Sequence, residues 1–239
     1  MQTYLINLDR TPERLAAFYD TNPHMRGACR FAAIDGHTIM REKLVQENIF
    51  MPDVRYSAGA IGCALSHLRL WNIVMNSGEP ATLAEDDGIL HRDFDTLVPA
   101  LIAELPPDWD IVVWGWNMES AMVYELFPGI TANILQVGNT IRQNAAVFQS
   151  DPVRRNLHRL KMCFGTVCYS ISPAGAKKLT ELVLPIRHFE IPLPGLSHPI
   201  PNIGIDIVLM SLYNRINAYV SVPPLVLTAN VVSQSTVQN

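Results

Sequence analysis

The chain has 239 residues, of which 49% are hydrophobic and 17% are charged, so it can bury the core of one large globular domain. Its formal net charge of −4 and its lack of Lys- and Arg-rich runs exclude nucleic acid as an expected partner and give no electrostatic membrane anchor. No apolar run approaches the roughly 20 residues of a spanning helix, and the first residues show no signal-peptide pattern, so we expect a cytoplasmic protein without a transmembrane segment.

The first residues predict a strand followed by a helix. Residues 3–8 alternate and are rich in strand-forming side chains, and Thr11-Pro12-Glu13 is typical of a helix start. The loop between them follows the carboxyl end of the strand, where open parallel sheets bind ligands. Asp9, Arg10 and Arg14 are therefore placed to contact a nucleotide. In the alternative interpretation, the two arginines only form surface ion pairs with the acids beside them, Asp9 and Glu13.

A second short strand and a long helix are predicted next. Residues 31–34 favour a strand that is closed by Asp35-Gly36, and Asp35 could accept hydrogen bonds from a ribose or a base, although turn chemistry alone explains it. Apolar residues between positions 61 and 75 recur at intervals of three and four and indicate a helix that ends at a glycine. Gly59 and Gly62 lie in its first turn, where the positive helix end could face a diphosphate or sugar.

The same helix carries Cys63, Ser66 and His67. A single histidine on a helix is more often a structural hydrogen-bonding group than a ligand, and we favour that interpretation for His67. The four cysteines of the chain lack the paired Cys or His spacing of a zinc site. We therefore expect buried free thiols.

Three consecutive carboxylates, Glu85-Asp86-Asp87, follow the apolar strand-like residues 81–84 and precede a glycine. Adjacent anions repel one another, so a fold that gathers them at the end of a strand is expected to place a cation there. Mg²⁺ or Mn²⁺ suits such a site, because these ions take carboxylate oxygens together with water and substrate phosphate. The alternative is a solvated acidic turn.

The second half of the chain continues the alternation of strands and helices. The expected order is a helix from Asp93 to Leu105, a buried strand over 110–115, a hairpin near 130–137, a strand over 165–171, a helix from Ser172, an irregular proline-rich segment over 185–201, and a strand over 218–222. Glu119 follows the buried strand, and the nearby Trp114 and Trp116 are either sugar-stacking or core residues. Asp206 follows the proline-rich segment.

Several blocks of this sequence resemble glycosyltransferase family 25, the bacterial lipooligosaccharide galactosyltransferases and their collagen-modifying relatives. The matching blocks, in chain order, are Ile6-Asn7-Leu8-Asp9-Arg10 with Arg14, Gly59-x-x-Gly62-Cys63-x-x-Ser66-His67, Glu85-Asp86-Asp87, and a weaker string over 165–183. The resemblance implies a single α/β domain over residues 1–239 with the nucleotide-diphospho-sugar transferase (GT-A type) fold. Its central sheet is expected to be mostly parallel and covered by helices.

The resemblance also implies an activity, namely the inverting, metal-dependent transfer of a hexose from a UDP-sugar to a hydroxyl of a glycan acceptor such as lipooligosaccharide. Galactose is the expected hexose, Mn²⁺ or Mg²⁺ the expected cofactor, and a peripheral contact with the inner membrane stays open. The expected nucleotide-sugar contacts are Asn7, Asp9, Arg10, Arg14, Asp35, Gly59, Gly62 and Asp86. The expected metal ligands are Asp87 with Glu85 or Asp86 assisting, and a third from the C-terminal segment, such as Asn230, Gln234 or Ser235.

The catalytic base is the least defined part of the prediction. Inversion needs a carboxylate on the acceptor side of the sugar, and Asp206 is the first candidate, with Glu119 as the second. Asp206 could instead be the N-cap of a short helix. Two other functions remain as alternatives: a non-catalytic homologue that binds a sugar nucleotide or glycan, and a metal-dependent phosphohydrolase. The acceptor, the linkage and the oligomeric state are not indicated by the sequence.

Overall fold

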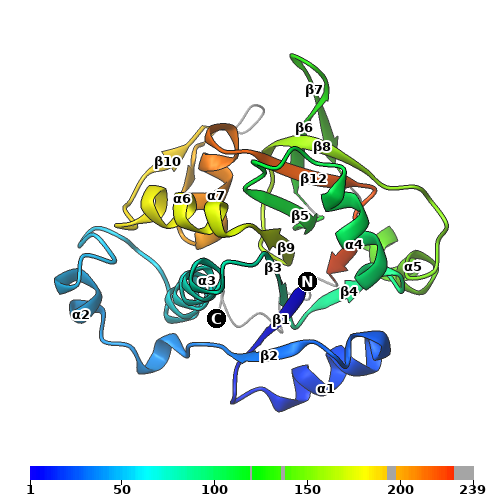
Figure 1. The fold of residues 1–239 in the computed structure, drawn as a ribbon. Coiled ribbons are helices and arrows are strands. Elements are labelled where there is room, and N and C mark those ends of the chain that lie inside the picture. Colours follow the sequence, from blue (N-terminus) through cyan, green and yellow to red (C-terminus); the bar gives the residue numbers. More distant parts are fainter. Residues whose placement is uncertain (119, 136–137, 193–197, 229–239) are drawn as a thin grey trace.

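The computed structural model describes residues 1–118, 120–135, 138–192 and 198–228, which form a helix-covered central sheet (Figure 1). Its strands are β1 (Gln2–Asn7), β2 (Cys29–Ala32), β3 (Ala81–Glu85), β4 (Gly88–Leu90), β5 (Ile111–Gly115), β6 (Ala121–Phe127), β7 (Ile130–Leu135), β8 (Asn156–Met162), β9 (Cys168–Ile171), β10 (Glu190–Ile191), β11 (Ile200–Pro201), β12 (Ala218–Val222) and β13 (Val226–Thr228). Its α-helices are α1 (Pro12–Thr21), α2 (Arg41–Gln46), α3 (Ala58–Ser77), α4 (Phe94–Ala103), α5 (Gly138–Phe148), α6 (Pro173–Val183) and α7 (Ile205–Leu212).

The central sheet has nine strands in the order β2-β1-β3-β9-β5-β12-β8-β6-β7. Strand β1 pairs in parallel with β2 and β3, and β12 pairs in parallel with β5. The remaining pairings are antiparallel, including both edges of β9, which lies between β3 and β5. The α/β class is confirmed, but the prediction of a mostly parallel sheet is corrected to a mixed sheet. The short turn between β6 and β7 permits only an antiparallel pair, since parallel strands need a long crossover.

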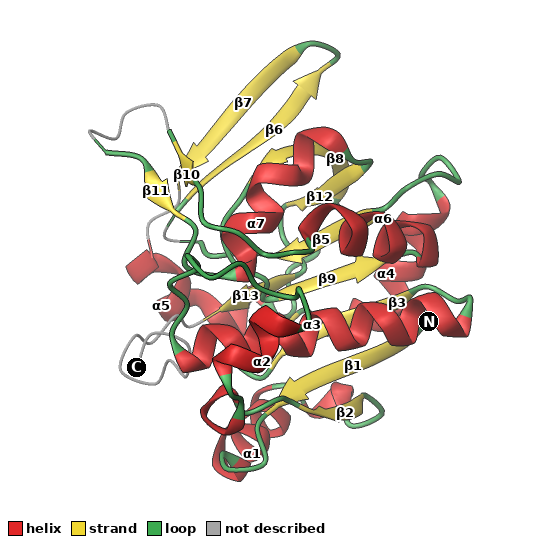
Figure 2. Ribbon diagram, turned by 90° about the vertical axis from the view of Figure 1, so that its left-hand side faces the viewer, coloured by secondary structure: helices red, strands yellow, loops and turns green. Residues whose placement is uncertain are grey.

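Helices cover both faces of this sheet (Figures 1 and 2). Helices α3, α6 and α7 pack on one face, where Trp71 and Tyr169 are among the largest buried side chains. Helices α1 and α4 contribute to a second buried cluster, which includes Trp114. Because β3 and β5 lie between these layers, all their residues except Glu85 are buried, which explains their continuous apolar sequences.

Two predicted helix ends, at Ser172 and Gly78, are found at the expected residues. Ser172 caps α6 by accepting a hydrogen bond from the backbone N–H three residues later, and Ser57, which was not predicted as a cap, does the same for α3. Gly78 ends α3 with a positive φ of 71°, a conformation that suits glycine. At α7, however, the N-cap is Gly204, and Asp206 is the second residue of the helix. The interpretation of Asp206 as an N-cap is therefore wrong.

Of the two expectations for Trp114 and Trp116, at the end of β5, the structure supports the core role and not the sugar-stacking role. Trp114 and Trp116 are 0% and 1% exposed and belong to the core, so they offer no stacking surface for a sugar. The hairpin expected near 130–137 is present as β6 and β7 and projects beyond the rest of the sheet (Figure 2). None of the helices in the described ranges combines the length and the hydropathy of a membrane span.

Candidate active site

The carboxyl ends of β1 and β3 lie side by side and bring the first loop next to the carboxylate cluster. The two strands are parallel neighbours with Ile6 opposite Glu85. Asn7 therefore lies beside Asp86, and its Nδ2 donates a hydrogen bond of 2.7 Å to Asp86 Oδ2. The sequence order strand, loop and helix thus produces a polar edge, as predicted for ligand binding at the ends of parallel strands.

Asp86 is held by two polar side chains, Asn7 at the end of β1 and Arg14 in α1. Its Oδ2 accepts from Asn7, and its Oδ1 accepts from Arg14, whose Nε lies at 2.9 Å and whose second guanidinium nitrogen also contacts it. Burial disfavours the charged guanidinium, but Asp86 outweighs this effect and raises the pKa of Arg14. Both oxygens of Asp86 are thus engaged by protein groups, and Asp86 fixes the arginine in place.

Glu85 faces the other side of the cluster. Its Oε1 accepts a hydrogen bond of 2.5 Å from Thr166 Oγ1 and lies 3.6 Å from His67 Nε2. Burial alone would raise the pKa of Glu85, but His67, Thr166 and Arg14 together hold it below the usual value. Glu85 is therefore an ionised carboxylate between α3 and the segment that precedes β9.

Of the three carboxylates, Asp87 is in the environment that least favours its ionised form. Its Oδ2 accepts from Thr228 Oγ1 at 3.1 Å, while its buried Oδ1 has no hydrogen-bond partner among the residues that the structure describes. Burial and then the charge of Glu85 raise the pKa of Asp87 to about 6. A buried carboxylate oxygen without a donor, next to a second carboxylate, is a site that a cation would stabilise.

Two cavities border this cluster. The first, of about 70 Å³, is lined by most of the residues predicted to contact the nucleotide sugar: Asn7, Arg10, Arg14, Asp35, Gly59, Gly62 and Asp86. The second, of about 150 Å³, is lined by polar side chains from four distant segments, including Asp87, Thr166, Asp206 and Thr228. Glu85 and Cys63 line both cavities. The fold thus places an arginine-lined space next to a carboxylate-lined space.

The arginines at the first cavity form ion pairs with carboxylates that are remote in sequence. Arg10 pairs with Asp35 at 2.8 Å, and Arg14 pairs with Asp86. Asp9 is instead engaged by Arg30 at 2.6 Å, and it does not line either cavity. The expectation of local ion pairs with Asp9 and Glu13 is therefore wrong, because the strand pairing of β1 with β2 and β3 brings other acids closer.

Gly62 in the first turns of α3 and Gly36 in the preceding turn have a packing role. A Cβ at Gly62 would lie 2.4 Å from the carbonyl oxygen of Ile34, and one at Gly36 would lie 1.8 Å from that of Ala58. Ser66 fixes the same contact, since its hydroxyl accepts from the Ile34 N–H at 2.8 Å. The close approach of helix and turn forms the wall of the first cavity.

Asp206 reaches the second cavity from the start of α7. Its Oδ2 accepts from the backbone N–H of Gly165 at 3.3 Å, and burial raises its pKa. Gly204 leaves room for this carboxylate, since a Cβ there would lie 2.6 Å from Asp206 Oδ1. Glu119 lies outside the described residues, as do the C-terminal candidates Asn230, Gln234 and Ser235.

A comparison of the sequence with models of protein families identifies the family of this chain. The family described as glycosyltransferase family 25 (LPS biosynthesis protein) matches residues 1–193. The chain belongs to glycosyltransferase family 25. Membership makes it a glycosyltransferase of a lipopolysaccharide-biosynthesis family, with a sugar donor and a glycan acceptor as its substrates. A solved structure described as the crystal structure of A197 from STIV is similar over 92% of this chain and 81% of that chain, with 11% identity and a TM-score of 0.39.

Some residues of this family 25 site were not found by sequence reasoning. Thr166 and Thr228 hold Glu85 and Asp87; Thr166 falls at an unspecified position of the weaker family string, and Thr228 lies in no recognisable motif. Thr228 reaches the site because β13 pairs with β4, which places it opposite Gly88. Tyr169, which lies on β9, forms a hydrogen bond with His67. Its only sequence signal was its place in the weaker family string.

Proposed function

We propose that this glycosyltransferase moves a hexose, with galactose expected, from a UDP-sugar to a hydroxyl of a glycan acceptor such as lipooligosaccharide, with inversion and with a divalent cation. The observation that carries the proposal is the adjacency of the two cavities at Glu85. One presents arginines to an anionic donor, and the other presents carboxylates to a cation and an acceptor. The donor's sugar would lie where they meet.

Asp87 and Glu85 are the residues that would hold Mn²⁺ or Mg²⁺. Asp87 has a buried oxygen without a hydrogen-bond donor in the described part of the chain, and Glu85 is ionised beside it, which suits a hard cation. Asp86 is less available, because Arg14 and Asn7 engage both of its oxygens. When bound, the ion supplies positive charge that stabilises the departing UDP.

Arg10 and Arg14 would bind the diphosphate through charge-assisted hydrogen bonds. Both line the first cavity, and each is held by a carboxylate from another segment, Asp35 or Asp86. These ion pairs restrict the rotamers of the arginines before the donor arrives. Less conformational entropy is then lost on binding.

Asp206 would take the proton of the acceptor hydroxyl while the acceptor oxygen forms a bond to the anomeric carbon and the bond to UDP breaks. Burial raises its pKa, which makes its carboxylate a better proton acceptor than a solvated one. The Gly165 N–H holds one oxygen, so the side chain has a fixed orientation in the cavity.

The test is a transfer assay with UDP-galactose, a lipooligosaccharide acceptor and Mn²⁺, using Asp206→Asn. Transfer should fall by roughly 10² to 10⁴, the usual contribution of general base catalysis, while UDP-galactose binding persists. Asp95→Asn is a matched control, because Asp95 is also the second residue of a helix but is exposed and outside both cavities.

Normal transfer by Asp206→Asn would remove the assignment of the base and move it to Glu119. Cleavage of simple phosphate esters as fast as UDP-sugars would support the phosphohydrolase alternative. Donor binding without any turnover across acceptors would support the non-catalytic alternative.

A further inference from the structure

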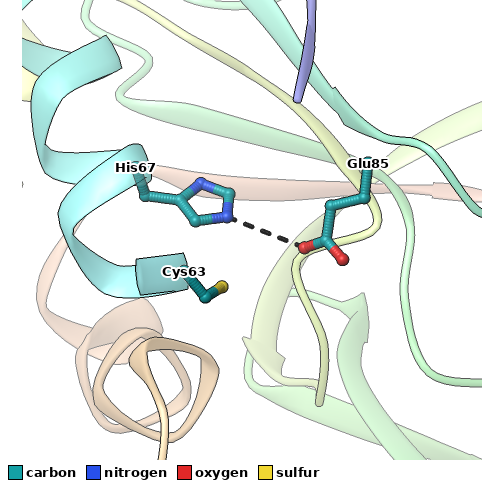
Figure 3. Close-up of side chains that lie close together, drawn as sticks. All are labelled: Cys63, His67 and Glu85. Carbon is teal, nitrogen blue, oxygen red and sulfur yellow. Dashed lines mark ion pairs between the residues drawn. The ribbon is translucent and has the colours of Figure 1, made fainter. Parts of the chain in front are cut away.

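A second group of metal-binding side chains lies beside the carboxylates. Cys63 and His67 stand one turn apart on α3, so they share a helix face, and Glu85 approaches them from the end of β3 (Figure 3). Each offers one ligand atom, and the three atoms all lie within 4.8 Å of one another. This group of sulfur, nitrogen and oxygen differs in chemistry from the all-oxygen environment of Asp87.

His67 is oriented as a ligand. Its side chain is 1% exposed, and its Nε2, which points toward Glu85 in Figure 3, has no hydrogen-bond partner within the described ranges. On the other side of the ring, Nδ1 lies 2.7 Å from Tyr169 Oη, which also accepts a hydrogen bond from Trp71 Nε1. When Nδ1 carries the ring proton and donates it to Tyr169 Oη, the ring is fixed and Nε2 presents a lone pair, as in metal-bound histidines whose other nitrogen donates to an outer partner.

The distance between His67 and Glu85 supports a shared ion. The 3.6 Å between Nε2 and Oε1 is longer than an ordinary hydrogen bond. Two ligands at about 2.0 to 2.2 Å from one tetrahedral ion are separated by roughly 3.3 to 3.6 Å, which is close to this value. The Cys63 sulfur has to move by no more than about 1 Å, which a small side-chain rotation provides.

We propose that Cys63, His67 and Glu85 bind a borderline-soft transition-metal ion, with Zn²⁺ as the reference ion. Thiolate and imidazole ligands select such ions over Mg²⁺ and Mn²⁺, which prefer oxygen. Three protein ligands leave a fourth tetrahedral position for water or another ligand, and Cys63 and Glu85 both line the two cavities. Since Glu85 is also a proposed ligand of the hard cation, Zn²⁺ inhibits glycosyl transfer; this consequence, unlike the binding itself, rests on the proposed function.

The binding test uses Co²⁺ as a spectroscopic probe on the full chain and Zn²⁺ as its competitor. The wild type should bind one Co²⁺ with a thiolate charge-transfer band that Zn²⁺ removes. Cys63→Ser should lack the band and bind Zn²⁺ at least about 100-fold more weakly, since even outer-shell partners are worth 10- to 100-fold. Cys29→Ser is the control, because Cys29 is an exposed thiol on β2 that should contribute nothing.

Two further variants keep the result interpretable. Glu85→Gln should weaken Zn²⁺ binding yet retain the charge-transfer band at saturating Co²⁺, so the proposal can be judged even when Cys63→Ser does not fold. Asp87→Asn should bind Zn²⁺ normally even if it transfers no sugar, which separates this proposal from the proposed function. Absence of the band in the wild type, or its persistence in a folded Cys63→Ser variant, would overturn the proposal.

Discussion

Asp87→Asn should stabilise the metal-free protein at neutral pH although it removes a site residue. The pKa of Asp87 is raised in the folded state from the usual 3.8 to about 6, so folding disfavours its ionised form. Below about pH 4 the carboxyl is protonated in both the folded and the unfolded chain, and its effect vanishes. As the pH rises from about 4 to about 6, the unfolded chain ionises first, and wild-type stability is lost across this window.

The magnitude follows from the size of that shift. At about 1.36 kcal/mol per pKa unit, a rise from 3.8 to about 6 gives an upper limit of about 3 kcal/mol. Asp87 is half-buried and shares its field with Glu85 and Asp86, so we expect the variant to gain about 1 to 2 kcal/mol. For a chain of this length, each kcal/mol corresponds to a rise in Tm of roughly 2 to 4 °C.

The assay is urea unfolding of chelator-treated wild type and Asp87→Asn at about pH 7.5 and about pH 4. The gain should be present at the higher pH and absent at the lower one. Adding Mn²⁺ at about 100 times its Kd should then raise wild-type stability by about 2.7 kcal/mol and leave the variant unchanged. Asp53→Asn, which alters an exposed carboxylate in a turn, should have no effect in any condition.

Two results would contradict this reasoning. If Asp87→Asn is less stable than the wild type at neutral pH without metal, the hydrogen bond from Thr228 outweighs the charge repulsion. If Mn²⁺ stabilises both proteins equally, Asp87 is not a main ligand of the ion, and the cation is bound elsewhere.

Three further outcomes can be measured. Arg14→Gln should weaken UDP binding in calorimetry by about 1.5 to 3 kcal/mol, and urea unfolding should show a loss of about 2 to 4 kcal/mol, because Asp86 is left without its cation. Gly62→Ala should lower stability in the same assay by about 1 to 3 kcal/mol, because its Cβ would lie 2.4 Å from a backbone oxygen. Below about pH 6, apparent Mn²⁺ affinity in a titration should fall about tenfold per pH unit, since Asp87 gains a proton there.

Each of these outcomes has an internal check. Adding Asp86→Asn to Arg14→Gln should recover stability but not UDP affinity, whereas recovery of both would place the arginine outside the donor contacts. Gly27→Ala should be harmless, since nothing lies within 4 Å of a Cβ there; equal losses at both glycines would refute the packing argument. Mn²⁺ affinity that is constant from about pH 7 to about pH 5 would show that no such carboxyl binds the ion.

The sequence by itself determined the features that local chemistry controls. The strand over residues 3–8, the helix start at Ser172 and the stop at Gly78 were predicted because periodicity and capping depend on residues a few positions apart. The arginines and the carboxylates were each predicted to follow the end of a strand, and the family resemblance implied that both belong to one nucleotide-sugar site; the structure brings them to the same edge.

Only the tertiary structure decided the direction of the strands and the partners of the site residues. Nothing local indicated that β9 would enter the sheet antiparallel between β3 and β5. The adjacent acids 85–87 look equivalent in sequence, yet one binds Arg14 across 72 residues, one faces His67 and Thr166, and one faces Thr228 across 141 residues. These choices depend on strand order and register, which are set by packing over the whole core.

The cysteines show the same division. The spacing of the cysteines along the chain showed no zinc pattern, and the sequence therefore predicted buried free thiols. That prediction is wrong for Cys29, which is exposed. Spacing rules detect ligands that share a loop or a helix, and here the third ligand comes from another element, β3. The sequence determines which groups can bind a proton, a phosphate or a metal. The pairing of β1 with β3 beneath α3 determines which of these groups lie close together, because a ligand set is defined by distances in space.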